Sequence, residues 1–115
     1  SDKEKSIIDW DTLEQIRLNP DEGVKTRFIM GLISFSVAMN EKVLIFSQYI
    51  HPLELIKDHI TNFFGWDEGK EVFQMHGKLD QKHRQKLINI FNDPKTEAKI
   101  LLASTKCCSE GINLV

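Results

Sequence analysis

Three short apolar runs, separated by segments of helical periodicity, most constrain the fold of this 115-residue chain. The runs suit buried strands, and they span Lys42–Ser47, Glu71–Met75 and Ala98–Ser104. Strand-like runs that alternate with helices and short connectors are typical of βαβ units. The sequence therefore predicts an α/β fold with a parallel sheet and helices on both of its faces.

The segments around these runs repeat apolar residues every three or four positions, as one face of an α-helix does. Before the first run, the repeating positions are Val24, Phe28, Leu32, Phe35 and Met39. Between the first two runs, they are Leu53, Ile56, Ile60 and Phe63. Asp80 suits the N-cap of a third helix, which we expect to run to about Asn92.

The first 22 residues differ in composition from the rest of the chain. They hold seven acidic and three basic residues and show no sustained period. We expect an acidic arm or connector over residues 1–22, with a short helical turn at Thr12–Arg17, and a domain over residues 23–115. No apolar stretch approaches the ~18 residues of a membrane span, and the N-terminal residues lack the apolar block of a signal peptide. We therefore expect no membrane partner and no secretion.

The loops that follow the three strands are the places to seek chemistry, because ligands of parallel sheets bind at the carboxyl ends of the strands. The loop after the third strand offers Ser104, Thr105, Lys106 and Gly111. Their hydroxyls and amides could cradle an anion, although an ordinary turn has the same composition.

A basic stretch follows the second strand, within a chain that holds 15 basic and 17 acidic residues overall. Its cations are Lys78, Lys82, Arg84 and Lys86. They could contact a phosphate backbone through charge alone, or they could form a solvated helix face.

Several kinds of site have no support in the sequence. The four histidines lack metal-ligand spacing, and the adjacent Cys107 and Cys108 suit reduced thiols better than a disulfide or a zinc site. Walker A, GxSxG and GxGxxG motifs are absent from these 115 residues. The residues alone predict phosphate-binding loops and name no reaction.

Three ordered segments resemble motifs of the Swi/Snf-type ATPases, which are helicase-like motors. KVLIFSQY (Lys42–Tyr49) resembles motif IV, HGKLDQKHRQKLINIFND (His76–Asp93) resembles the block that follows, and ILLASTKCCSEGINLV (Ile100–Val115) resembles motif V. HPLELIKDH, GKLDQK and ASTKCCSEGINLV further resemble the plant CLASSY-like proteins. The resemblance implies that residues 23–115 are a partial second RecA-like lobe that carries motifs IV to V and ends before motif VI.

The same resemblance implies an ATP hydrolase that translocates on double-stranded DNA. ATP with Mg²⁺ would be bound mainly by the first RecA-like lobe, so this fragment alone is expected to be inactive. Carried over by position, the residues toward the nucleotide are Gly111 and Asn113. Those toward the nucleic acid are Gln48, Gly77, Lys78, Ser104, Thr105 and Lys106. Cys107–Glu110 depart from the usual small, glycine-containing stretch, and Glu110 adds a negative charge beside the expected phosphate site.

The CLASSY-like resemblance also implies a cellular setting. It places the parent protein in the nucleus, on chromatin, in RNA-directed DNA methylation and gene silencing, with RNA polymerase IV as a partner. Two alternatives stay open. One is a catalytically weak scaffold of the same fold that recruits the polymerase. The other is a strand-separating RNA or DNA helicase, against which the STKxxxEGIN pattern argues.

Overall fold

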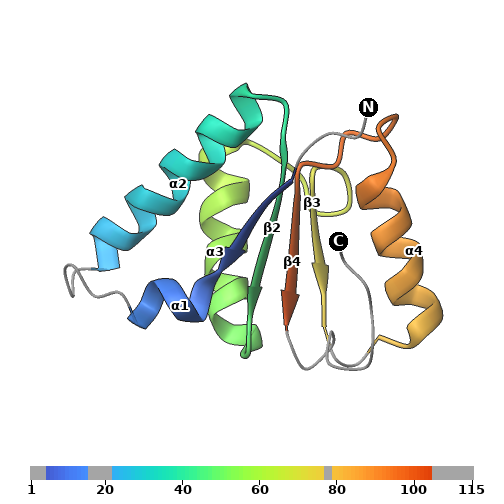
Figure 1. The fold of residues 1–115 in the computed structure, drawn as a ribbon, viewed down its shortest axis with the longest axis horizontal. Coiled ribbons are helices and arrows are strands. Elements are labelled where there is room, and N and C mark those ends of the chain that lie inside the picture. The colour runs from blue at the N-terminus through green and yellow to red at the C-terminus, as the bar shows by residue number, and fades with distance from the viewer. Residues whose placement is uncertain (1–4, 16–21, 77–78, 105–115) are drawn as a thin grey trace.

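A computed structural model describes residues 5–15, 22–76 and 79–104. Its strands are β1 (Lys5–Asp9), β2 (Lys42–Ser47), β3 (Val72–Met75) and β4 (Ile100–Ser104). Its helices are α1 (Trp10–Gln15), α2 (Glu22–Ala38), α3 (Ile50–Phe64) and α4 (Gln81–Asn92). The strands form one parallel sheet in the order β1-β2-β4-β3 (Figure 1). The predicted α/β fold is confirmed, and each predicted strand starts within two residues of the observed one.

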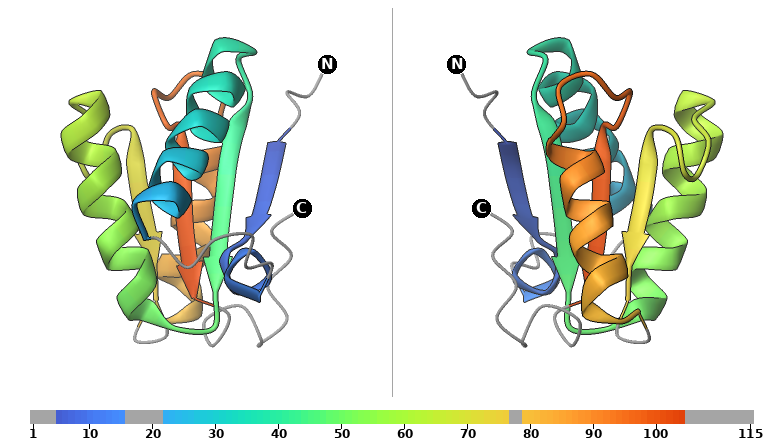
Figure 2. Two further views of the ribbon diagram at one scale, coloured as in Figure 1. Left: turned by 90° about the vertical axis from the view of Figure 1, so that its left-hand side faces the viewer. Right: turned by 90° about the vertical axis from the view of Figure 1, so that its right-hand side faces the viewer.

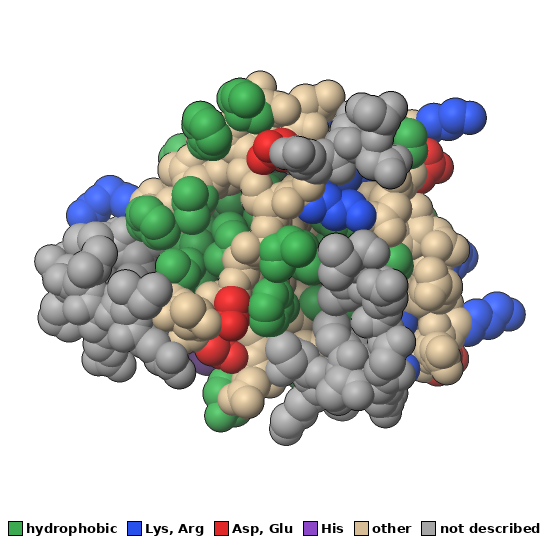
Figure 3. Space-filling view, viewed as in Figure 1, with side chains coloured by type: hydrophobic (Ala, Val, Ile, Leu, Met, Phe, Trp, Pro, Cys, Tyr) green, Lys and Arg blue, Asp and Glu red, His purple; other side chains and the backbone are tan. Residues whose placement is uncertain are grey.

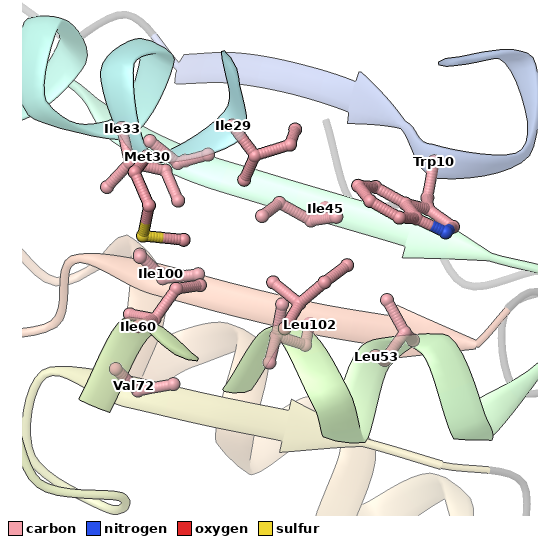
Figure 4. Packing of buried hydrophobic residues seen from close by; sticks show 12 residues of the cluster. Trp10, Ile29, Met30, Ile33, Ile45, Leu53, Ile60, Val72, Ile100 and Leu102 are labelled. Carbon is pink, nitrogen blue, oxygen red and sulfur yellow. The ribbon is translucent and has the colours of Figure 1, made fainter. Parts of the chain in front are cut away.

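Helices cover both faces of the sheet because side chains of the central strands alternate between the faces. Ile45 of β2 and Leu102 of β4 point toward α2 and α3, where they pack with Ile33 and Leu53 (Figure 4). The alternate positions of the same strands pack on the other face against α4 (Figure 2), in a cluster that includes Leu44, Leu101, Ile88 and Phe91. Two separate apolar cores therefore hold the three layers together.

The N-terminal residues contribute a strand that the sequence pattern did not predict. β1 pairs in parallel with β2, from Lys5 opposite Lys42 to Asp9 opposite Phe46. Trp10, the first residue of α1, is 7 % exposed and belongs to the α2/α3 core. Residues 5–15 thus pack on the sheet, and α1 begins two residues before the predicted turn at Thr12. The boundary of an arm at residue 22 stays a prediction.

The apolar repeat that predicts α2 lies mostly in solvent. Phe28, Phe35 and Met39 are 54 %, 65 % and 58 % exposed, whereas Ile29 and Ile33 are buried. The predicted helix is confirmed, and most of the face that its repeat marks is exposed. Apolar residues lie on nearly every side of α2, so periodicity cannot choose which face is buried.

Asp80 caps the N-terminus of α4, as the sequence predicts. Asp80 Oδ1 accepts a hydrogen bond from the backbone N–H of His83 at 2.8 Å. The same oxygen lies 2.7 Å from His83 Nδ1. The backbone hydrogen bond, and then the side-chain one, lower the pKa of Asp80 below its ordinary value of 3.8. The cap therefore stabilises the fold at pH values above 3.8, and this stabilisation is lost as the pH falls through the lower, folded-state pKa.

We expect Asp80→Ala to lower the melting temperature by a few degrees at pH 7, because α4 loses its capping acceptor. At a pH below the lowered pKa of Asp80, the wild type and the variant should melt closer together, since the wild-type carboxyl is then protonated. Thermal unfolding followed by circular dichroism measures both values. Glu54→Ala, at an exposed position of α3, is the control. An equal difference at both pH values would contradict a role for the Asp80 charge.

Candidate nucleic-acid interface

The carboxyl ends of the strands meet at one edge of the sheet. β2 ends at Ser47, β3 at Met75 and β4 at Ser104, and the three arrowheads point the same way in Figure 1. The predicted loops at 48–51 and 76–80 therefore start from this edge, as expected for parallel strands. Gly77, Lys78 and the third predicted loop, 105–111, lie outside the described residues.

Two serines end the central strands side by side. Ser47 and Ser104 are register partners, so their side chains lie on the same face of the sheet, and they are 0 % and 1 % exposed. The Ser47 hydroxyl donates to Asp11 Oδ1 at 2.6 Å. Ser104 Oγ has no hydrogen-bond partner among the described residues. A buried hydroxyl without a partner costs about 1–3 kcal/mol, so Ser104 is poised for a further polar group.

Asp11 is a site residue that sequence reasoning missed. Besides Ser47, its carboxylate accepts the backbone N–H of Gln48 at 2.7 Å through Oδ2. This contact places a negative charge beside Gln48 and occupies an amide that could otherwise bind an anion. Asp11 and Ser47 are 36 positions apart in the sequence, so only the pairing of β1 with β2 could have revealed this contact.

The structure brings two of the expected nucleic-acid-binding residues to the same edge. Gln48 is exposed in the loop after β2, and Ser104 is buried at the end of β4. The other expected site residues lie outside the described part of the chain: Gly77, Lys78, Thr105, Lys106, Gly111 and Asn113. The roles of all these residues stay predictions.

The basic stretch divides between the surface and the interior. Lys82 and Lys86 are exposed on α4, one helical turn apart, whereas Arg84 is only 5 % exposed. An anionic partner could meet the two lysines on one face of the helix, but Arg84 does not belong to that surface.

The donors at this edge suit phosphate oxygens better than a metal ion. Hydroxyls and backbone amides bind anions, whereas Mg²⁺ prefers carboxylates together with phosphates and water. Across residues 5–15, 22–76 and 79–104, no group of three or more His, Cys, Asp or Glu side chains could hold a metal ion. The Ser104 hydroxyl, which has no hydrogen-bond partner among the described residues, could donate to a phosphate oxygen. No described helix is long and apolar enough to cross a membrane.

Comparison with known proteins identifies relatives over most of the chain. Residues 24–115 match the model of the helicase conserved C-terminal domain. The SNF2 domain-containing protein CLASSY 3 of Arabidopsis thaliana is 56 % identical over 118 residues, which cover 100 % of this chain and 8 % of CLASSY 3. CLASSY 4 of the same plant is 49 % identical over 104 residues, covering 90 % of this chain and 9 % of CLASSY 4.

A solved structure shares the fold. The crystal structure of the C-terminal part of the Fun30 ATPase domain superposes with a TM-score of 0.64 at 30 % identity, covering 91 % of this chain and 33 % of that one. The resemblance to the second lobe of Swi/Snf-type ATPases, and to CLASSY-like proteins, is therefore confirmed. The chain spans less than a tenth of the length of these two curated relatives and a third of the solved one.

Proposed function

This chain belongs to the helicase conserved C-terminal domain family, and we propose that it is part of a DNA-dependent ATPase that translocates on double-stranded DNA. The names of its relatives support an SNF2-type motor: CLASSY 3 and CLASSY 4 are SNF2 domain-containing, and the Fun30 structure is part of an ATPase domain. ATP with Mg²⁺ is then bound mainly by a first RecA-like lobe of the same protein. Residues 1–115 by themselves are expected to be inactive.

The observation that carries this proposal is the buried Ser104 hydroxyl at the carboxyl edge of the sheet. A translocase must hold DNA without reading its sequence, and a hydroxyl that donates to a phosphate oxygen provides such a contact. In this proposal Gln48, Gly77, Lys78, Thr105 and Lys106 line the same DNA-facing rim. Gly111 and Asn113 lie toward the nucleotide.

The proposal extends to the cellular setting. As the resemblance to CLASSY-like proteins implies, the parent protein acts on chromatin in the nucleus, within RNA-directed DNA methylation and gene silencing. The first RecA-like lobe and RNA polymerase IV are the proposed protein partners. The proposed contact with the polymerase rests on the resemblance to CLASSY-like proteins.

A second candidate function is a scaffold of the same fold that recruits the polymerase without rapid ATP turnover. The Asp11 carboxylate favours it, because a negative charge at Gln48 opposes phosphate binding at that position. The two candidates differ in whether DNA stimulates ATP hydrolysis by the full-length protein.

The decisive experiment measures ATP turnover by the full-length protein at increasing concentrations of double-stranded DNA. We expect duplex DNA to stimulate turnover. We also expect Ser104→Ala to raise the DNA concentration for half-maximal stimulation about tenfold, since a hydrogen bond to a charged group is lost. Asn62→Ala, at an exposed position of α3, is the matched control and should behave as wild type.

The outcomes separate the candidates. Because Ser104 Oγ has no partner among the described residues, Ser104→Ala should not lower the melting temperature, and a weaker DNA response then reflects lost binding. Absence of turnover from well-folded protein would favour the scaffold. Stimulation by RNA or single strands in place of duplex DNA would favour a strand-separating helicase.

A further inference from the structure

The outer face of α2 is unusually apolar for a helix on the surface. Phe28, Phe35 and Met39 project there with more than half of each side chain exposed. Between residues 26 and 38, Arg27 is the one charged residue. Figure 3 shows hydrophobic side chains gathered over α2. Exposed apolar patches of this kind often mark a surface that packs against another segment, so this face suits such a contact.

α4 provides an internal comparison within the same sheet. It also packs one apolar side on the sheet, through Ile88 and Phe91. Its exposed positions are all polar or charged: Gln81, Lys82, His83, Gln85, Lys86, Asn89 and Asn92. α4 therefore lacks the apolar outer face of α2, whereas α3 carries two exposed apolar side chains, Leu55 and Phe63.

Small residues between the aromatic side chains leave room for close packing. Gly31 is exposed, and a Cβ atom added there would meet nothing within 4 Å. Ser34 and Ala38 are also exposed on this side of the helix. A second segment could pack between Phe28 and Phe35 and bury both rings.

The size of the apolar face favours a covering segment from the same polypeptide. At ~150–250 Å² for a large buried side chain, the exposed parts of Phe28, Phe35 and Met39 amount to on the order of 350 Å². Stable complexes between separate proteins bury about 800 Å² on each partner. A tethered segment needs less area, because the link raises its effective concentration to about the millimolar range.

The relatives show where such a segment can come from. This chain covers 33 % of the Fun30 structure, which is itself only the C-terminal part of an ATPase domain. It covers 8 % of CLASSY 3. We infer that the outer face of α2 is the docking site for an apolar helical segment of the same polypeptide, from outside residues 1–115. This inference rests on the proposed function in one respect, namely that the chain is one part of a longer SNF2-type protein.

Cysteine alkylation in the full-length protein tests this inference. Phe35→Cys places a thiol on the outer face of α2, and Gln85→Cys places the matched control on the exposed side of α4. Rates of maleimide labelling are followed by peptide mass spectrometry, which distinguishes these sites from Cys107 and Cys108. Each rate is normalised to the rate for the same variant in urea. We expect Cys at position 35 to react at least about tenfold more slowly than Cys at position 85.

The protein concentration and a second variant decide how the face is covered. Protection by a tethered segment is unchanged over a hundredfold dilution, whereas protection by a second copy or a separate subunit weakens and overturns the inference. Gly31→Gln, added to Phe35→Cys, fills the space that the segment would occupy and should raise the labelling rate several-fold. Equal labelling at positions 35 and 85, or protection that Gly31→Gln leaves intact, also overturns the inference.

The labelling needs neither ATP nor DNA, so its result does not depend on whether the proposed ATPase function is correct. Protection at position 35 without DNA-stimulated turnover would support the covered α2 face and contradict the motor function. DNA-stimulated turnover with full labelling at position 35 would support the motor function and contradict the docking site.

Discussion

Replacing Leu102 with alanine should lower the free energy of unfolding of the chain by about 2–5 kcal/mol. Leu102 is fully buried in the central strand β4 and belongs to the core formed with α2 and α3 (Figure 4). Strands on both sides and two helices on its face leave little freedom for the surroundings to fill the cavity. Urea unfolding followed by circular dichroism measures the loss.

Leu55→Ala is the matched control for this prediction. Leu55 lies on α3 with 51 % of its side chain exposed, so its truncation should change the unfolding free energy by less than about 0.5 kcal/mol. Equal effects of the two substitutions would show that the core does not pack around Leu102 as described. A changed denaturant slope would instead indicate that Leu102→Ala alters the compactness of the native or unfolded state.

Lys42→Met should destabilise the chain by about 1.5–3 kcal/mol, because a buried charged donor is lost. Lys42 is 7 % exposed at the start of β2, and its ammonium donates to the backbone carbonyls of Phe91 and Asp93, the latter at 3.1 Å. It also lies 5.6 Å from the centre of the Phe91 ring. These contacts tie the C-terminal end of α4 to the sheet, where the helix dipole favours a cation.

Methionine retains most of the aliphatic length of Lys42, so the variant reports mainly on the ammonium group. Hydrogen exchange should quicken most at the C-terminal end of α4, near Phe91, and less in α3. Lys95→Met, at an exposed lysine, is the control and should change the unfolding free energy by less than about 0.5 kcal/mol. If Lys42→Met were equally harmless, the carbonyls at the end of α4 would not depend on Lys42.

The position of β4 shows what local patterns leave undecided. Its residues 100–104 read as a strand from the sequence, because a short run of Ile, Leu and Ala suits a buried strand. Its place between β2 and β3 depends on pairing between segments more than 20 residues apart, which no local pattern records. β1 likewise depends on pairing between distant segments. Its sequence KSIID is short and mixed in polarity, and its pairing with β2 makes it a strand.

Part of the candidate site could be predicted from the sequence, and part depends on the tertiary structure. Parallel strands bring their carboxyl ends to one edge, so the topology expected from the sequence was sufficient to place Gln48 and Ser104 there. Among the described residues, the Ser104 hydroxyl lacks a partner because it is buried, and the Asp11 carboxylate reaches Gln48 because α1 approaches β2. Neither feature has a sequence signal.

From α2 onward, the sequence by itself determined the kinds of elements and their order along the chain, because apolar spacing and the Asp80 cap act within a few residues. The resemblance of three ordered motifs likewise identified the family from the sequence alone. Only the tertiary structure decided which side of α2 is buried, because Ile33 and Phe35 are equally apolar and only contact with the sheet separates them. It also decided that Lys42 and Arg84 are buried and that Phe28, Phe35 and Met39 are exposed, since burial depends on which segments pack together.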